Sequence, residues 1–553
     1  MTPRFNLVDA PWIPCLLAAD GTVHEQSLRD VLVQAPGIRE ISHPSPLVTV
    51  ALHRLLLAIL HRHFARGYGP TSEGEWAELW QRGAFDAAAI DGYLARWRGR
   101  FELFDAERPF YQVASLRTHT GQPPSELTFE LASSANPATL FDHTIDSELT
   151  PAQAARNLLV FQSFALGGMV TLQKGDDPNM HKFARAAPLT GGAVLLVKGR
   201  NLFETLMLNL HRYHPTDDEP FPSEGPDLPA WERNEETTVG ERRPAGYLDL
   251  LTWQCRRLLL RPESTGDGRI VIREVVVRKG EQFPRGFLLH GRETMLAFVK
   301  RQQPKEGGEP WSPIGFEEEK ALWRDSQALF QSLEGQHARP KMLDWLSDLV
   351  GDELLRRSQV LPLEAFGLAP DQKRVLFWRH ERLPLPLAYL RDEHLVADLS
   401  LALAFAEEVG RELQGSVYTL AKLLLAPSAG QANARKPTGK VIGPLVQSLA
   451  PERRYWPRLE EAFSTLLVGL AHAPPGDSAE EHRLRALAAW QGSVLGAARR
   501  AFAELTRSLD TSARSLKAAA AAERALHGRL RRVIKERGIQ TAEEEAREST
   551  ERS

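Results

Sequence analysis

A helical periodicity that begins after Pro384 and Pro386 constrains the fold of this chain more than any other feature. Apolar residues there recur at alternating steps of three and four, the spacing that places them on one face of an α-helix. Two such series are Leu395, Leu399, Ala402, Ala406, Val409 and Leu413, and Leu459, Phe463, Leu466 and Leu470. Two further helices are expected from about 480 to 509 and, with Ser512 as the N-cap, from 512 to 536. Four amphipathic helices joined by breaker-rich segments predict a four-helix bundle.

The first 384 residues instead mix short strand and helix patterns that proline and glycine interrupt. Strands are expected at 5–9, at 12–17 and at 270–278, the last of which is rich in valine and isoleucine. Helices are expected at 47–64 and at 151–166, because proline precedes or opens each of them.

The predicted fold class is therefore α+β. A large mixed α/β N-terminal domain is expected over 1–384, a C-terminal four-helix bundle over 385–540 and a frayed polar tail over 541–553.

Composition excludes several classes of protein. Apolar residues make up 42% of the 553 residues and charged residues 25%, so a collagen-like or wholly disordered chain is ruled out. The two cysteines, Cys15 and Cys255, cannot alone build a thiolate zinc site and fit a reducing compartment. No apolar stretch reaches the roughly 18 residues of a membrane helix, and no secretory signal is readable at 1–5. A cytoplasmic protein without a membrane contact is expected.

Positive charge is concentrated near the end of the chain. The whole chain has a net charge of −3, but between Arg483 and Arg537 there are 13 lysines and arginines against four acidic residues, a local excess of 13 − 4 = +9. Such a block can be a solvated helix face or a surface that binds a polyanion. The residues singled out as non-specific DNA contacts are Arg529, Arg531 and Arg532.

The common signatures of enzymes are missing. The sequence contains no phosphate-binding Walker loop, dinucleotide glycine fingerprint, Gly-x-Ser-x-Gly elbow or His-Glu-x-x-His motif. His61 and His63 would point to different sides of a helix, which argues against a metal site that includes them and His53. No catalytic residue and no cofactor is therefore expected. The alternative is a metal-dependent nuclease or other phosphodiesterase that draws on Asp105 and Glu107.

Several motifs occur in a fixed order along the chain. They are Phe5-Asn6-Leu7-Val8-Asp9-Ala10-Pro11-Trp12-Ile13-Pro14, Glu107-Arg108-Pro109-Phe110-Tyr111-Gln112, Asn136-Pro137-Ala138-Thr139-Leu140-Phe141-Asp142-His143, Ala187-Pro188-Leu189-Thr190-Gly191-Gly192 and Gly367-Leu368-Ala369-Pro370-Asp371-Gln372. In their order and spacing, and in the terminal helical bundle, the chain resembles the CasA family, the large subunits of the type I-E CRISPR surveillance complex Cascade.

The resemblance implies a non-enzymatic subunit that acts in antiviral defence. It would recognise the protospacer-adjacent motif of double-stranded target DNA from the minor groove, promote strand opening and R-loop formation by the guide RNA, and dock a helicase-nuclease. The implied partners are the guide RNA (crRNA) ribonucleoprotein, the other Cascade subunits, the target DNA and the helicase-nuclease.

The resemblance also implies a loop at 136–146 that contacts nucleic acid. Its residues combine a stacking ring with polar tips, and those singled out are Asn136, Phe141, Asp142 and His143. The alternative is a core phenylalanine beside a capping pair.

In the family a glycine-rich loop approaches the minor groove, where a missing side chain lets the backbone come close to base edges. The matching candidates are Gly167 and Gly168, Lys174-Gly175, and the stretch 179–182 with Asn179 and Lys182 as possible donors. Structural turn glycines are the alternative.

Two single residues complete the implied site. Lys279 matches a family lysine that reaches the minor groove, with Arg278 as the competing candidate and an ordinary hairpin tip as the alternative. Gln372 matches a family glutamine that acts as a wedge beside the first unpaired base step. Because the chain lacks the cysteine-rich element that some relatives carry before the lysine, no metal is expected.

Overall fold

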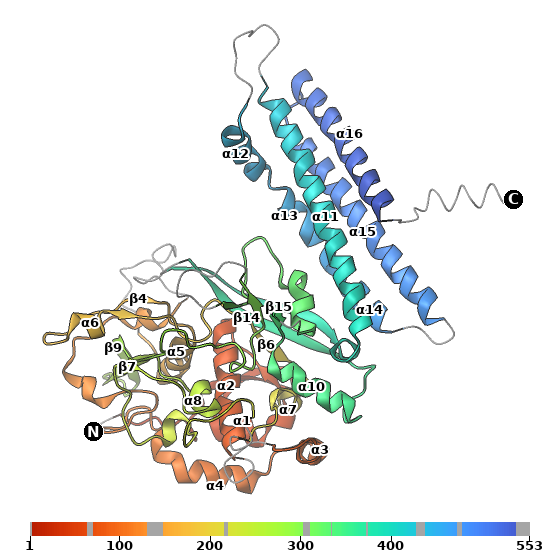
Figure 1. The fold of residues 1–553 in the computed structure, drawn as a ribbon. Coiled ribbons are helices and arrows are strands. Elements are labelled where there is room, and N and C mark those ends of the chain that lie inside the picture. Colours follow the sequence, from red (N-terminus) through yellow and green to blue (C-terminus); the bar gives the residue numbers. More distant parts are fainter. Residues whose placement is uncertain are drawn as a thin grey trace. The chain divides into compact units, whose positions relative to one another are not determined.

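The computed structural model describes most of the chain (Figure 1). The described residues are 3–63, 70–129, 148–214, 219–301, 310–332, 335–371, 374–426, 437–472 and 478–537. They belong to two compact units, of which the first comprises Met1–Glu318 and Ala328–Arg391 and the second Glu319–Gln327 and Asp392–Ser553. The second unit thus takes in a short earlier segment, and its main part begins at Asp392 rather than at the expected 385.

A small sheet opens the first unit. It has the order β2-β1-β3, with antiparallel strands β1 (Ile13–Leu17), β2 (Val23–Gln26) and β3 (Ile38–Ile41). The strand predicted at 12–17 is confirmed.

The strand predicted at 5–9 is wrong, because Asn6 bends the chain there. The Asn6 Oδ1 accepts the backbone N–H of Val8 at 3.1 Å, and the Asn6 carbonyl accepts the N–H of Ala10 at 2.8 Å. Asparagine favours such turns because its short side chain can bond the backbone two residues on.

Helix α2 (Pro46–His63) lies in the middle of the first unit (Figure 1). Every residue from Pro46 to His61 is buried, so the helix is covered on all sides. It packs against α5 (Pro151–Phe164), α7 (Leu202–Asn209), α8 (Tyr247–Leu251) and strand β14 (Val360–Asp371). The helices predicted at 47–64 and 151–166 are therefore confirmed within two residues.

Two long antiparallel hairpins complete the frame of this unit. Strands β8 (Arg256–Ser264) and β9 (Ile270–Lys279) form one of them, which confirms the strand predicted at 270–278. Strand β14 pairs with β15 (Arg374–Pro386) and with β6 (Val194–Val197), in the order β15-β14-β6.

Shorter elements connect these parts. The helices are α1 (Leu28–Val33), α3 (Glu73–Arg82), α4 (Ala87–Trp97), α6 (Pro178–His181), α9 (Ser326–Phe330) and α10 (Lys341–Gly351). The strands are β4 (Gly168–Met169), β5 (Phe183–Ala184), β7 (Gly240–Glu241), β10 (Glu281–Gln282), β11 (Phe298–Lys300), β12 (Trp311–Pro313) and β13 (His337–Ala338).

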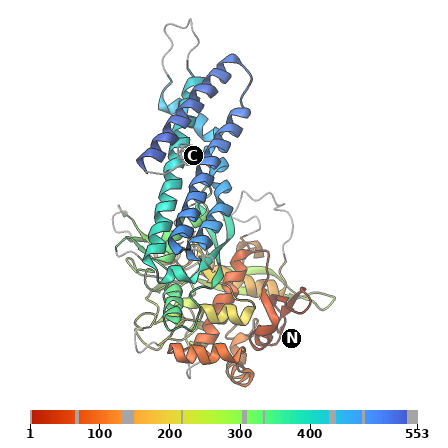
Figure 2. The same ribbon diagram turned by 90° about the vertical axis from the view of Figure 1, so that its right-hand side faces the viewer.

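Long helices that run side by side form the second unit (Figure 2). They are α11 (Glu393–Leu424), α14 (Glu460–Ala471), α15 (Ala479–Arg507) and α16 (Ala513–Glu536), with the short helices α12 (Gly439–Leu449) and α13 (Pro451–Tyr455) between α11 and α14 in the chain. The predicted stripes are buried apart from Leu395, and the Ser512 side chain accepts the Ser515 N–H as the N-cap of α16. The four-helix bundle is confirmed.

The segment Glu319–Gln327 supplies part of the bundle core. The Trp323 ring stacks on Phe463 with a centroid distance of 4.5 Å and meets Trp456 and Trp490 edge-on. The sequence pattern gave no sign of this contact, because the partners lie more than 130 residues away in the chain.

Candidate nucleic-acid interface

One edge of the first unit gathers most of the described residues that the sequence singled out. Lys279 is the last residue of β9, and its Nζ donates a hydrogen bond to the carbonyl of Met180 at 2.7 Å. Met180 lies in α6, within the segment 167–184 that also contains Gly167, Gly168, Asn179 and Lys182. The lysine candidate and the glycine-loop candidates are therefore neighbours.

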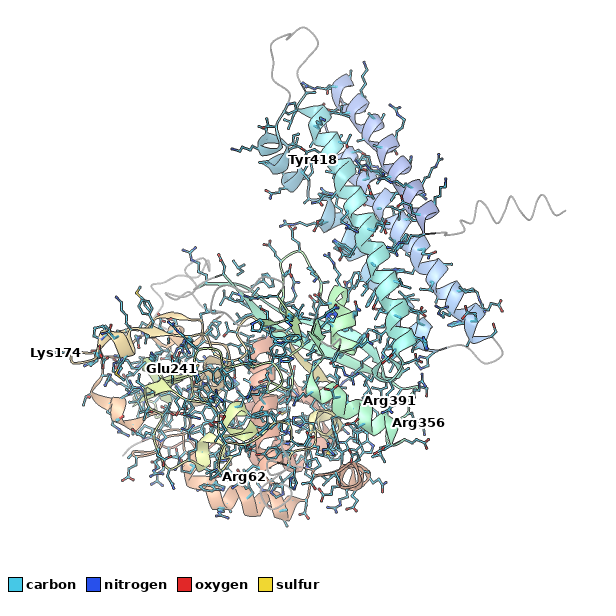
Figure 3. The ribbon with its side chains drawn as sticks, in the orientation of Figure 1. Arg62, Lys174, Glu241, Arg356, Arg391 and Tyr418 are labelled. Atoms are coloured by element: carbon cyan, nitrogen blue, oxygen red, sulfur yellow. The ribbon has the colours of Figure 1, made fainter. Side chains whose placement is uncertain are left out.

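The segment 167–184 leaves the unit on β4 and returns on β5. Gly168 pairs with Ala184, and Met169 pairs with Phe183. Figure 3 shows Lys174 at the outer end of this segment, pointing away from the rest of the unit. The segment is therefore a two-stranded projection with α6 near its tip.

Polar groups on this projection are available to a ligand. Asn179 is exposed, and its side-chain amide has no hydrogen-bond partner among the described residues. Lys182 is exposed, and its Nζ lies 5.6 Å from the centre of the Phe183 ring. Both side chains can donate to phosphate or to acceptors on base edges.

Of the candidate glycines, Gly167 is required by packing. A Cβ on Gly167 would lie 3.0 Å from the backbone nitrogen of Ala186, which is closer than most side chains tolerate. Gly175 has φ of 98° with open space around it, so the turn itself favours glycine there. Packing and turn geometry therefore explain the glycines at Gly167 and Gly175 without a ligand.

Arg256 holds the base of the segment 167–184, and sequence reasoning missed it. Its side chain is 3% exposed, and its Nη2 donates to the carbonyls of Leu166 at 2.8 Å and Arg185 at 3.0 Å. These two carbonyls flank the segment, so one guanidinium fixes both of its ends. The signal in the sequence was an arginine at the start of an apolar strand without an acidic residue beside it.

Like charges face each other at this end of the β8–β9 hairpin. Arg256 is paired across the strands with Lys279, and Arg257 is paired with Arg278. None of the four forms an ion pair with a carboxylate in the described part of the chain. Like charges directly opposite one another destabilise a sheet, so stability does not explain this arrangement. The four residues Arg256, Arg257, Arg278 and Lys279 are called here the β8–β9 edge.

Burial changes the electrostatics of these cations. Burial, and then the positive charge of Arg185, lower the pKa of the Lys279 ammonium. Arg278 is 2% exposed and donates to the carbonyls of Val277 and Thr120, at 2.8 and 2.9 Å. Between the two candidates left open by the sequence, Lys279 is the one with a partly exposed side chain.

A second set of candidates lies in the second unit. Arg529 Nη1 lies 2.9 Å and Arg532 Nη2 lies 3.3 Å from the carboxylate of Glu412 in α11. Arg531 is exposed, and its side chain has no partner among the described residues. The three arginines that the sequence grouped together therefore have different surroundings.

The candidates Asn136, Phe141, Asp142, His143 and Gln372 lie outside the described residues. For Gln372 the flanking strands are described: β14 ends at Asp371 and β15 begins at Arg374.

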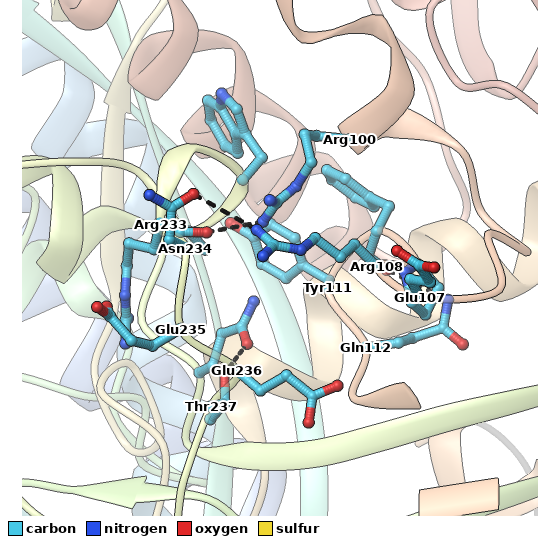
Figure 4. A pocket seen from close by; sticks show the side chains of 15 residues that line it. Arg100, Glu107, Arg108, Tyr111, Gln112, Arg233, Asn234, Glu235, Glu236 and Thr237 are labelled. Carbon is cyan, nitrogen blue, oxygen red and sulfur yellow. Dashed lines mark hydrogen bonds between the residues drawn. The ribbon is translucent and has the colours of Figure 1, made fainter. Parts of the chain in front are cut away.

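The motif Glu107–Gln112 lines a pocket (Figure 4). Arg100 Nη2 donates to the carbonyl of Arg233 at 2.8 Å, and Arg108 Nη1 lies 3.4 Å from Asn234 Oδ1. The acidic residues of the lining are Glu107, Glu235 and Glu236. Because these carboxylates offset the arginines, the pocket does not favour an anionic ligand.

Of the two residues of the nuclease alternative, Asp105 has a structural role. The Asp105 carboxylate accepts the backbone N–H groups of Glu107 and Arg108, at 2.9 and 2.7 Å, as in a turn. Within the described ranges, no group of three or more histidine, cysteine, aspartate or glutamate side chains could hold a metal ion.

The three histidines of α2 do not converge. Burial lowers the pKa of His53 to about 3, so its imidazole is neutral near pH 7. The His61 ring contacts those of His211, Tyr213 and Tyr247, whereas His63 contacts the ring of Tyr93. Among the described helices, none is long and apolar enough to cross a membrane.

Comparison with known proteins identifies the relatives of this chain. Residues 6–501 match the family of CRISPR-associated protein Cse1. The chain is 35% identical over 527 residues to CRISPR-associated protein CasA/Cse1 of Thermus thermophilus, covering 94% of this chain and 96% of the relative. The crystal structure of Thermus thermophilus CasA superposes with a TM-score of 0.75 at 31% identity, covering 96% of this chain and 99% of that one.

A second similar structure is a chain of a CRISPR RNA-guided surveillance complex, with a TM-score of 0.70 at 24% identity over 95% of this chain and 100% of that one. At this identity the likeness concerns the fold alone. The family match and the Thermus relative each cover most of the sequence, and the chain therefore belongs to the Cse1 family of CRISPR-associated proteins, which is also called CasA.

Proposed function

We propose that this protein is the large subunit of a type I-E Cascade complex and inspects duplex DNA for the protospacer-adjacent motif. In this role it contacts the minor groove beside the motif, promotes strand opening by the guide RNA, and offers a docking surface to a helicase-nuclease. It acts without catalysis of its own, in the cytoplasm, together with the other Cascade subunits.

Membership of the Cse1 family supports the assembly part of the proposal, as does a chain of the same fold in an RNA-guided surveillance complex. The observation that carries the DNA-binding part is the β8–β9 edge. There, Lys279 lies against a projection that exposes Asn179 and Lys182. The cations of the edge form no ion pair with a carboxylate in the described structure, although Asp176, Glu236 and Glu241 lie near enough to act on their charges. A polyanion would supply the missing negative charge.

The proposal assigns different tasks to different residues. Lys279, Asn179 and Lys182 donate to phosphates or to acceptors in the minor groove. Contacts in that groove distinguish A·T from G·C pairs but not A·T from T·A. The loop at 136–146 contacts nucleic acid, and Gln372 inserts beside the first base step to open.

The test replaces Lys279 by alanine in the assembled complex. Affinity for motif-bearing duplex should fall, and the slope of log affinity against log salt should shrink by about 0.9 if one phosphate contact is lost. Lys279→Arg should restore part of the affinity because it keeps the charge. Lys300→Ala, which removes an exposed lysine of the same unit, is the matched control and should change neither quantity.

An unchanged affinity and slope for Lys279→Ala would refute the assignment of Lys279. Degradation of duplex DNA by the purified chain with magnesium would instead favour the nuclease alternative.

A further inference from the structure

One row of positions on α16 combines positive charge with small residues. The row advances by alternating steps of three and four, so its members lie along a single line on the helix. In order they are Arg514, Lys517, Ala521, Arg524, Gly528, Arg531 and Lys535. The row has five cations, no acidic residue and a length of about 31 Å at about 1.5 Å per residue. It is called here the α16 row.

The α16 row lies opposite the buried face of its helix. The buried positions are Ser515, Ala518, Ala522, Leu526, Leu530 and Val533. All five cations of the row are exposed, and their side chains have no ion pair or hydrogen bond with any other described residue.

The neighbouring arginines behave differently. Arg529 and Arg532 contact Glu412, and Arg537 contacts Glu408 at 2.7 Å, so these three cations are compensated by α11. The contrast sorts the basic block into residues that join two helices and residues that face solvent. Only the second group is free to attract a ligand.

Gly528 adds an independent observation. Glycine destabilises the interior of a helix relative to alanine. Yet a Cβ on Gly528 would meet no atom within 4 Å, so packing within the protein does not require glycine there. A backbone from another molecule that lies close along the row would benefit from the missing side chain.

We infer that the α16 row binds the sugar-phosphate backbone of DNA without reading its sequence. This inference rests on the proposed function, in which DNA is the ligand, and adds a second contact surface to it. Cations spread along the whole length of the row suit an extended ligand that carries charge along its length, and phosphates carry no direct sequence information. Both a duplex and a single strand offer this backbone, and separate probes distinguish them.

The experiment uses the full-length chain and labelled DNA of about 30 nucleotides without the motif, either single-stranded or as a duplex. Arg524→Gln combined with Arg531→Gln should weaken binding severalfold. It should also reduce the slope of log affinity against log salt by about 1.8 for a duplex or about 1.4 for a single strand. The probe with the larger loss identifies the preferred form of DNA.

Arg411→Gln combined with Lys422→Gln is the matched control, because both residues are exposed on α11 and the loss of charge is the same. It should leave the slope unchanged. Gly528→Leu should raise the melting temperature, since leucine favours a helix, and yet weaken DNA binding severalfold.

Equal slopes for the two double variants would overturn the inference and leave the row as a solvated or protein-docking face. Unchanged DNA binding by Gly528→Leu would likewise show that no DNA backbone lies close to Gly528. Neither result would touch the proposed function, because Lys279→Ala tests that function on motif-bearing DNA in the assembled complex.

Discussion

The β8–β9 edge and the α16 row both present positive charge, but the protein holds that charge in different ways. At the edge, the guanidinium groups of Arg256 and Arg278 are buried and donate to backbone carbonyls, which fixes their positions. On the row, exposed side chains extend from one helix without partners among the described residues.

The difference indicates two modes of recognition. Lys279 lies at the end of a hairpin that these buried guanidinium groups hold in place. A donor held in place can distinguish one arrangement of acceptors from another, because a misplaced acceptor loses its hydrogen bond. Exposed cations attract any phosphate backbone, and their effect is screened beyond a Debye length of about 8 Å at physiological salt. We therefore expect the edge to contribute specificity and the row to contribute affinity.

The largest effect is expected when Arg256 of the β8–β9 edge is replaced. Arg256→Ala should destabilise the first unit by about 2–4 kcal/mol, because it empties a buried site and leaves the Leu166 and Arg185 carbonyls without their donor. Binding of motif-bearing duplex should be lost, whereas binding of motif-lacking DNA persists. Thermal unfolding and anisotropy titrations measure the two effects.

Leu259→Ala is the control for this loss of stability. Leu259 packs with Val113, Leu116 and Val276 in the core under the same hairpin, and its truncation should destabilise the protein by about 2–5 kcal/mol. Because it leaves the Arg256 contacts in place, motif binding should survive below the melting temperature. Equal loss of motif binding in the two folded variants would show that Arg256 has only a structural role.

A smaller effect is expected when Glu412 in the second unit is replaced. Glu412→Gln should remove the ion pairs of Arg529 and Arg532, at a cost of at most about 1 kcal/mol because these groups are partly exposed. The freed arginines should then strengthen binding of motif-lacking DNA and steepen its salt dependence. Unchanged binding would mean that cations beside the α16 row do not reach the ligand.

The smallest effect is a difference in pH dependence. Since burial and then Arg185 lower the pKa of Lys279, its positive charge is lost as the pH rises through that lowered value, before an ordinary lysine loses its charge. Motif-dependent binding should fall in this alkaline range before binding to motif-lacking DNA does, because three of the five cations of the α16 row are guanidinium groups, which keep their charge. Titrations from neutral pH up to about 10.4, the ordinary pKa of lysine, measure this, and Lys279→Arg should abolish the difference. Parallel profiles for both DNAs would contradict it.

Sequence periodicity was sufficient to predict the helices and strands that depend on neighbouring residues in the sequence. The stripe Leu459, Phe463, Leu466 and Leu470 is buried as predicted, and the β-branched run at 270–278 is a strand. The exception at 5–9 arose because a single asparagine side chain bonds its own backbone, which outweighs the apolar pattern around it.

The candidate site was less predictable, because it depends on contacts between distant residues. Lys279 meets Met180 across 99 positions of sequence, and Glu412 meets Arg529 across 117. The side chain of Arg256 reads as an ordinary surface cation until the structure shows that it is buried between two carbonyls. Charge counting found the basic block of α15 and α16, but it could not separate the compensated arginines from the α16 row.

The path of the chain also affects how this protein can change by recombination. Trp323 fills the bundle core from a segment that precedes the bundle by about 70 residues, and the Arg324 guanidinium lies 3.7 Å over the Trp456 ring. A single crossover at 391/392 would therefore give a bundle whose central tryptophan comes from a different ancestor. The two units can be inherited from separate lineages only if the residues around Trp323 change with them.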